Sequence, residues 1–171
     1  MASSFEIAYE WMMDNEDARR AYAQVPDAPP GAFAISGINS AAFPAEFQVI
    51  AKIPQANRGG AIRLFYEVHF WNNWFSQLLS DDLAKRVFDA AVNMGAGTAI
   101  RLLQTAANAL GGALTVDGGW GTLTLTAANS ANPAALIAAF IEAREDHYRE
   151  IVRNNPADEK YLEEWLARAG K

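Results

Sequence analysis

The sequence predicts a mainly α fold, with one helical domain and a long ordered loop region in its amino-terminal part. Apolar residues recur at helical spacing through most of the 171 residues, whereas a sustained apolar–polar alternation typical of strands is missing. Residues 24–56 depart from the helical pattern, because they are rich in Pro, Gly, Ser and Asn and have no clear period. Their apolar and aromatic side chains argue against disorder. A long unperiodic segment inside a compact domain is often functional, so we expect an ordered loop with short extended pieces at most.

The expected helices follow from apolar spacing and from capping residues. A first helix covers residues 4–23, and an aromatic-rich helix covers residues 58–75. Ser80 and Thr98 are predicted caps, and Gly95 is a predicted helix stop. Further helices are expected after Thr122, after Asn132-Pro133 and after Asn155-Pro156, where Asn precedes a Pro in the first turn.

Composition excludes several classes of protein. The hydrophobic fraction of 51% suffices for a sizeable core, and the formal net charge of −6 argues against a general nucleic-acid binder. The sequence has no Cys, which excludes disulfides and thiolate chemistry. The amino terminus lacks a basic region followed by an uninterrupted apolar run, so we expect synthesis in the cytoplasm without a Sec signal. No run of 18 apolar residues predicts a membrane span.

Glu16 is the most informative single residue. It continues an apolar stripe formed by Phe5, Tyr9 and Met12, since steps of four, seven and eleven residues keep one face of a helix. Burying a carboxylate charge is costly, and desolvation favours the protonated form that a general acid needs. The alternative is that the helix ends before Glu16 and leaves its side chain in water.

The remaining motifs point away from metal and nucleotide chemistry. Gly95-Ala-Gly97 and Gly118-Gly119-Trp120-Gly121 do not follow a strand in a βαβ unit, so we interpret them as a helix stop and a turn. His69 and His147 lack the spacing of zinc ligands, and a zinc hydrolase normally needs three protein ligands. We expect no metal and no cofactor.

The aromatic-rich segment has two interpretations. Its side chains can fill the core of a helical domain, or some of them can line a groove that stacks sugar rings. Tyr66 and Trp71 are the best candidates for such a groove. Both interpretations can hold at once, because one face of a helix can be core while its edge lines a groove.

Several stretches together resemble the glycoside hydrolase family 108 proteins. They are FYEVHFWNNW (residues 65–74), FDAAVNMGAGTAIRLLQTAANAL (residues 88–110), DGGWGTLTLTAAN (residues 117–129) and the closing helix pair (residues 133–168). These relatives are bacterial and phage N-acetylmuramidases with a "predicted peptidoglycan domain" on their C-terminal side. The resemblance covers roughly residues 60–168 and implies a lysozyme-like helical domain.

The amino-terminal part departs from the family pattern. The family has Glu-Gly-Gly-Tyr at the end of its first helix, with the Glu as catalytic acid, and this chain reads Glu16-Asp17-Ala18-Arg19. The family continues with Asp-Pro-Gly-Gly-x-Thr-x-Tyr-Gly-Ile. Asp27 and the triplet Ser36-Gly37-Ile38 resemble the two ends of that segment, while Ala34 stands at the Thr position and Ser36 at the Tyr position.

The resemblance implies a peptidoglycan hydrolase that cleaves the β-1,4 bond between N-acetylmuramic acid and N-acetylglucosamine. Glu16 would be the general acid, and Asp27 is the candidate second carboxylate, as a base or an electrostatic stabiliser. Ser36, Tyr66, Trp71 and Asn93 are candidates for the wall of the substrate groove.

On this hypothesis residues 1–75 form a glycosidase-like part and residues 76–171 the peptidoglycan-domain part, packed as one compact unit. The expected partners are peptidoglycan glycan strands, with no nucleic acid and no integral membrane segment. The expected site of action is the bacterial cell wall or periplasm, reached through a holin or a secretion system. The alternatives are an inactive peptidoglycan-binding protein and a structural protein associated with a phage or a secretion apparatus.

Overall fold

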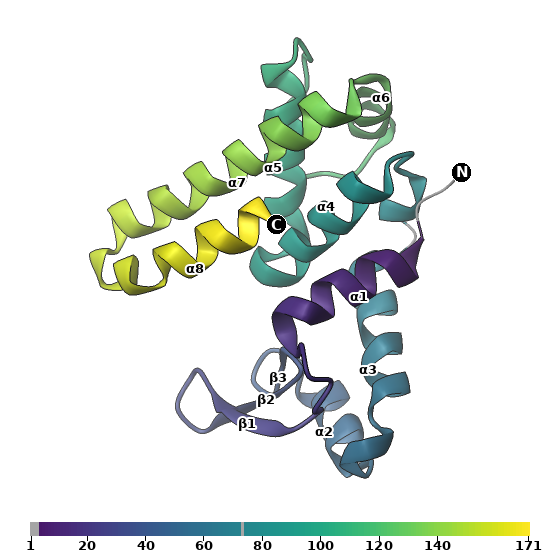
Figure 1. Cartoon of the computed structure of the whole chain (residues 1–171), viewed down its shortest axis with the longest axis vertical. Coiled ribbons are helices and arrows are strands. Elements are labelled where there is room, and N and C mark those ends of the chain that lie inside the picture. Colours follow the sequence, from purple (N-terminus) through teal and green to yellow (C-terminus); the bar gives the residue numbers. More distant parts are fainter. Residues whose placement is uncertain (1–3, 73) are drawn as a thin grey trace. The chain divides into compact units, whose positions relative to one another are not determined.

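The computed structural model describes residues 4–72 and 74–171 and divides into two compact units. The N-terminal unit is Phe5–Asn72, and the C-terminal unit takes in Asn73–Lys171 together with Ser4. Helices make up most of the described chain, and strands form one small sheet, so the predicted mainly α class is confirmed (Figure 1). Across the two described ranges, every helix is too short or too polar to cross a membrane.

The N-terminal unit consists of three helices, a small sheet and a π-helical segment within its described residues. In order they are α1 (Phe5–Glu16), β1 (Gln24–Asp27), β2 (Ala32–Ile35), β3 (Ile38–Asn39), α2 (Pro44–Lys52), the 3₁₀ turn η1 (Gln55–Asn57), α3 (Gly59–Tyr66) and the π-helical η2 (Glu67–Trp71).

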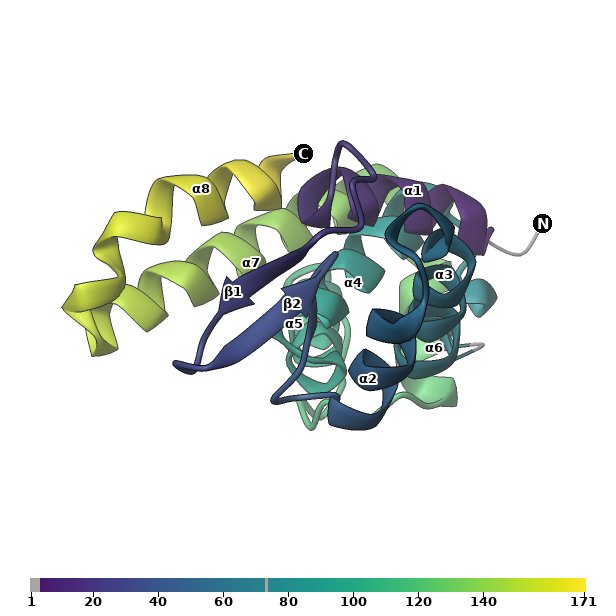
Figure 2. The same ribbon diagram turned by 90° about the horizontal axis from the view of Figure 1, so that it is seen from below.

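The region predicted as a long loop is ordered but more regular than expected. Its strands form an antiparallel sheet in the order β1–β2–β3, with Asp27 opposite Ala32 and Ile35 opposite Ile38, and Figure 2 shows the β1–β2 hairpin. Strands of two to four residues are too short to show a period in the sequence. Helix α2 was also missed, although it has a Pro in its first turn and buries Phe47 on its inner face.

Helix α1 ends at Glu16, seven residues before the predicted end at residue 23. The cause is Asp17, whose carboxylate accepts hydrogen bonds from the backbone N–H groups of Ala21 (2.9 Å) and Tyr22 (2.8 Å). A short polar side chain that captures backbone donors in this way competes with helix formation. Arg20 and Tyr22 both have positive φ, at 49° and 52°, which turns the chain away from the helix axis.

The predicted aromatic helix of residues 58–75 is also divided. The regular α-helix ends at Tyr66. The chain then continues as the π-helical segment η2, which ends at Trp71. Asn72 then adopts a left-handed conformation with φ of 42°, which ends the segment.

The C-terminal unit is helical throughout its regular parts. Its elements are the 3₁₀ turn η3 (Phe75–Gln77), α4 (Asp81–Met94), α5 (Ala96–Ala109), α6 (Thr122–Ser130), α7 (Pro133–Asn154), the 3₁₀ turn η4 (Pro156–Asp158) and α8 (Glu159–Gly170). Helices α7 and α8 run side by side in both views (Figures 1 and 2).

Two of the predicted caps of this unit, Ser80 and Asn132, are confirmed. Ser80 Oγ accepts a hydrogen bond from the N–H of Leu83 (3.2 Å), and Asn132 caps α7 with Pro133 in its first turn. Gly95 separates α4 from α5 with φ of 87°, as a helix stop requires. The prediction that Thr98 caps a helix is wrong, because α5 already begins at Ala96.

A buried ion cluster joins three helices of the C-terminal unit. Asp89 of α4 is fully buried and accepts hydrogen bonds from Arg144 of α7 (2.7 Å) and Arg168 of α8 (2.8 Å). An ion this deeply buried is tolerated only when it is paired and hydrogen-bonded. The cluster therefore links α4, α7 and α8 through one buried carboxylate.

Candidate functional site

The predicted apolar stripe of α1 is buried and leads to Glu16. Phe5, Tyr9 and Met12 retain only 8%, 5% and 0% of their surface. Burial raises the pKa of the Tyr9 phenol to about 12, because removal from water disfavours its charged form. Glu16 is the last residue of α1 and is partly buried, so the helix reaches far enough to place its carboxyl group on this face.

The backbone of Gly37 lies directly against the Glu16 carboxyl group. A Cβ atom added to Gly37 would be 2.5 Å from Glu16 Oε2 and 2.7 Å from the Tyr66 hydroxyl oxygen. Gly37 is itself exposed, so this carboxyl group borders a turn that faces solvent. A glycine is required here both for space and for its φ of +82°.

The turn that carries Gly37 is clamped from two sides. Its two residues, Ser36 and Gly37, join β2 to β3. Both have positive φ, 47° at Ser36 and 82° at Gly37, as in type I′ hairpin turns. The buried Tyr66 hydroxyl donates to the Ser36 carbonyl oxygen (2.7 Å), and the Ser36 hydroxyl donates to Asp17 Oδ2 (2.7 Å). These two bonds set the position of the turn next to Glu16.

Asp17 is not among the site residues predicted from the sequence, but its carboxylate takes part in this arrangement. Partial burial raises the pKa of its carboxyl group, but hydrogen bonds from Ser36, Ala21 and Tyr22 outweigh this effect and leave the pKa lowered. The signal in the sequence was that Asp17 stands where the resembled family has a glycine, and Ser36 where it has a tyrosine. The structure joins these two residues by a hydrogen bond.

Asp27, the candidate second carboxylate, lies exposed at the end of β1 in the same unit as Glu16. Its Oδ2 accepts a hydrogen bond from Asn39 Nδ2 (2.7 Å), and its Oδ1 accepts one from the N–H of Ala28 (2.8 Å). Asn39 Nδ2 also donates to the Ala28 carbonyl oxygen (2.7 Å). The carboxylate is therefore oriented by the hairpin while it stays open to solvent.

Two of the predicted groove residues are largely core residues. Trp71 is 3% exposed, with its ring 5.6 Å from that of Phe5, and Tyr66 is 1% exposed. The core interpretation of the aromatic segment describes them better, since a buried ring offers little surface to a sugar. Tyr66 nevertheless reaches the site through its hydroxyl group.

Asn93 belongs to the C-terminal unit, on α4. Its Oδ1 accepts a short hydrogen bond from the Tyr148 hydroxyl (2.6 Å). Burial raises the pKa of that hydroxyl, which keeps it a donor. This contact links α4 to α7, next to the buried Arg144.

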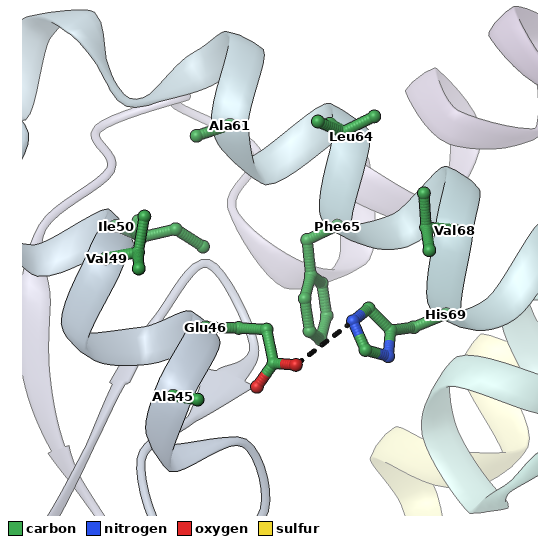
Figure 3. Close-up of a pocket in the computed structure, with 9 residues that line it drawn as sticks. All are labelled: Ala45, Glu46, Val49, Ile50, Ala61, Leu64, Phe65, Val68 and His69. Carbon is green, nitrogen blue, oxygen red and sulfur yellow. Dashed lines mark ion pairs between the residues drawn. The ribbon is translucent and has the colours of Figure 1, made fainter.

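A separate apolar pocket of about 430 Å³ lies between α2 and the α3–η2 segment (Figure 3). Val49, Leu64 and Val68 line it and are more than half exposed. At one end His69 Nε2 lies 3.4 Å from Glu46 Oε1, as the dashed line in Figure 3 marks. Across residues 4–72 and 74–171, His, Asp and Glu side chains form no group of three that could hold a metal ion.

Comparison with known proteins identifies the C-terminal region. Residues 98–170 match the sequence model of a family described as "Predicted Peptidoglycan domain". No curated protein matches the sequence. The fold is similar to a solved structure from Brucella abortus, described as "Structure of Brucella abortus SagA", with a TM-score of 0.68 and 18% identity over 97% of this chain and 89% of that one. Residues 98–170 are thus similar to a peptidoglycan-related domain, and the chain shares its fold with this solved structure.

Proposed function

We propose that this protein is a peptidoglycan hydrolase of the N-acetylmuramidase type, similar to glycoside hydrolase family 108. The observation that carries the proposal is the placement of Glu16, partly buried at the end of an apolar helix face and bordered by the solvent-facing Gly37 turn. The match of residues 98–170 to a peptidoglycan domain supports the choice of substrate. On this proposal Phe5–Asn72 carries the chemistry, and the rest of the chain carries the peptidoglycan domain.

The proposed reaction needs Glu16 in its protonated form. Its carboxyl group donates a proton to the glycosidic oxygen as the bond from that oxygen to the muramic acid anomeric carbon breaks. The N-acetylglucosamine unit leaves with a new hydroxyl group, and positive charge develops on the other sugar.

Asp27 has the second role in this proposal. Its carboxylate is held by Asn39 and by the Ala28 N–H, and it remains exposed. A fixed carboxylate can accept a proton from the attacking water or stabilise the developing positive charge. Asp17 is a poorer choice for this role, because its oxygens already accept hydrogen bonds from Ser36, Ala21 and Tyr22.

The test is mass spectrometry of the fragments released from purified peptidoglycan by the wild type and by Glu16→Gln. We expect muropeptides with reducing-end N-acetylmuramic acid from the wild type and none from the variant. Glu10→Gln is the matched control, since Glu10 lies on the same helix with an exposed side chain paired to Arg20. The Glu10→Gln variant also removes one carboxylate from α1. Because an exposed ion pair contributes only about 0–1 kcal/mol to stability, we expect this variant to fold and to keep the turnover of the wild type.

A second candidate is a peptidoglycan-binding protein without activity. Asp17, Ser36 and Ala34 favour it, because they stand where the resembled family has a glycine, a tyrosine and a threonine beside its catalytic acid. Such a protein would sediment with purified peptidoglycan and release no fragments, in both the wild type and Glu16→Gln. A protein that neither sediments with peptidoglycan nor cleaves it has a structural or interaction role instead.

A further inference from the structure

The C-terminal unit contains a hollow of about 370 Å³ that the proposed chemistry does not use. It lies where the glycine-rich loop after α5 meets the first turn of α6. The residues that matter below are Gln104, Thr115, Asp117, Trp120, Thr122 and Leu123. All six fall within residues 98–170, which match the peptidoglycan domain.

One buried amide holds the loop that forms this hollow. Gln104 of α5 is only 2% exposed, and its Nε2 faces Asp117 Oδ1 (2.9 Å), the Gly119 carbonyl oxygen (3.2 Å) and Thr124 Oγ1 (3.1 Å). Its Oε1 accepts a hydrogen bond from the N–H of Gly118 (2.9 Å). A loop held by such bonds is organised before any ligand arrives, which reduces the entropy lost on binding.

The glycines of the DGGWG loop allow it to approach α5 closely. A Cβ atom added to Gly118 would be 2.7 Å from the Gly97 carbonyl oxygen, and the φ of Gly118 is +77°. The sequence pattern that we interpreted as a simple turn therefore has a second effect. It brings Trp120 to the edge of the hollow in a fixed position.

Trp120 presents a supported aromatic surface. Its ring is nearly parallel to that of Trp74, at 8° and 6.5 Å, and the ring of Phe75 meets it edge-on at 5.4 Å. The side chain is still partly exposed and lines the hollow. Tryptophan is suited to ligands that combine an apolar face with polar groups, because its ring is large and rigid.

The polar groups of the hollow fit an uncharged ligand rich in hydroxyl and amide groups. Thr115 and Thr122 are exposed and bring hydroxyl groups that both donate and accept. A hydrogen bond from Gln104, with one from the Gly119 N–H, lowers the pKa of Asp117, so this carboxylate is an acceptor at neutral pH. Its negative charge, with the formal net charge of −6, disfavours anionic ligands.

We infer that this hollow binds an N-acetylhexosamine unit of a glycan strand, with the sugar stacked on Trp120 and its hydroxyl and acetamide groups bonded to Thr115, Asp117 and Thr122. The inference deepens the proposed function and rests on it for the identity of the polymer. It gives the C-terminal unit a glycan subsite of its own. Leu123, which is 78% exposed, lies at the rim and contacts the bound sugar.

The test uses the full chain with Glu16→Gln, so that the probe is not cleaved, and follows the tryptophan indole N–H signals by NMR. The probe is the tetramer of β-1,4-linked N-acetylglucosamine. We expect the Trp120 signal to shift on titration while that of Trp165 on α8 stays unchanged. Trp120→Ala should weaken binding about 30-fold, the effect of losing a central aromatic contact, whereas Trp165→Ala is the matched control and should change it little.

Two milder variants keep the test independent of folding defects. Leu123→Ala changes an exposed side chain, and Thr122→Val removes one hydroxyl group with little change of volume. Each should weaken binding several-fold with an unchanged melting temperature. An unshifted Trp120 signal, wild-type affinity in all these variants, or a Trp120 response to a muramyl stem peptide in place of the tetramer would overturn the inference.

The result also separates this inference from the proposed hydrolase. Fragment release without a Trp120 response would support the hydrolase and overturn the subsite. A Trp120 response without fragment release from the wild type would support the subsite and overturn the hydrolase.

Discussion

The contact between Gly37 and Glu16 can be tested with a pair of glycine substitutions. Gly37→Ala places a methyl group where the structure has the Glu16 carboxyl group and the Tyr66 hydroxyl, at 2.5 Å and 2.7 Å. Gly31→Ala in the β1–β2 turn is the matched control, because Gly31 also has positive φ, +91°, but no atom within 4 Å of the added carbon. The left-handed backbone costs roughly 1–2 kcal/mol in both variants.

The difference between the two variants isolates the contact. In Gly37→Ala the methyl group must push away Tyr66, whose hydrogen bond to the Ser36 carbonyl is buried. Leaving such groups unpaired costs about 1–3 kcal/mol more. Urea unfolding should therefore show Gly37→Ala as the less stable variant by about that amount.

Turnover should separate the variants further. The added Cβ atom would be 2.5 Å from Glu16 Oε2, so the carboxyl group must move away by about 1 Å to reach an ordinary contact distance. A misplacement of this size can lower kcat about 100-fold. Release of soluble muropeptides should fall accordingly in Gly37→Ala and stay near the wild-type rate in Gly31→Ala. Equal stability and equal turnover of the two variants would refute the reasoning.

Three further predictions concern stability. Because hydrogen bonds lower the pKa of Asp17 in the folded state, the carboxylate stabilises the fold above its unfolded pKa of about 3.9, and this contribution is lost as the pH falls through the lower, folded value. Urea unfolding should therefore show Asp17→Asn less stable than the wild type at pH 7, with the gap closing below about pH 4; a gap independent of pH would contradict this. Asp89→Ala leaves the buried Arg144 without its partner and should cost about 3–5 kcal/mol, whereas Glu145→Ala breaks a partly exposed pair with Arg149 and should cost at most about 1 kcal/mol in the same assay. Asn132→Ala removes the cap of α7 and should cost about 1 kcal/mol, measured by thermal unfolding against wild type; no change would mean that the bond to the Ala135 N–H contributes nothing.

The parts of the fold that could be predicted depend on neighbours in the sequence. Ser80, Asn132 and Gly95 act on the turn of helix next to them, so their effect is visible without tertiary contacts. The apolar stripe of α1 follows from helical spacing in the same way, and it led to Glu16. The departures from prediction lie at the end of α1, where the Asp17 carboxylate captures backbone N–H groups four and five residues further on, and in the region of residues 24–56, where the strands are short.

The sequence alone determined the helical class and most helix starts, because these depend on periodicity and local capping, and the same periodicity made Glu16 a candidate. Only the tertiary structure decided what surrounds Glu16. The Ser36–Gly37 turn is held beside it because Ser36 accepts a hydrogen bond from Tyr66 and donates one to Asp17, which are 30 and 19 residues away from Ser36 in the chain. The tertiary structure likewise decided the partners of Asp89, because Arg144 and Arg168 are 55 and 79 residues away from it in the chain. Pairings of this kind follow from how the elements pack, and no local pattern in the sequence specifies them.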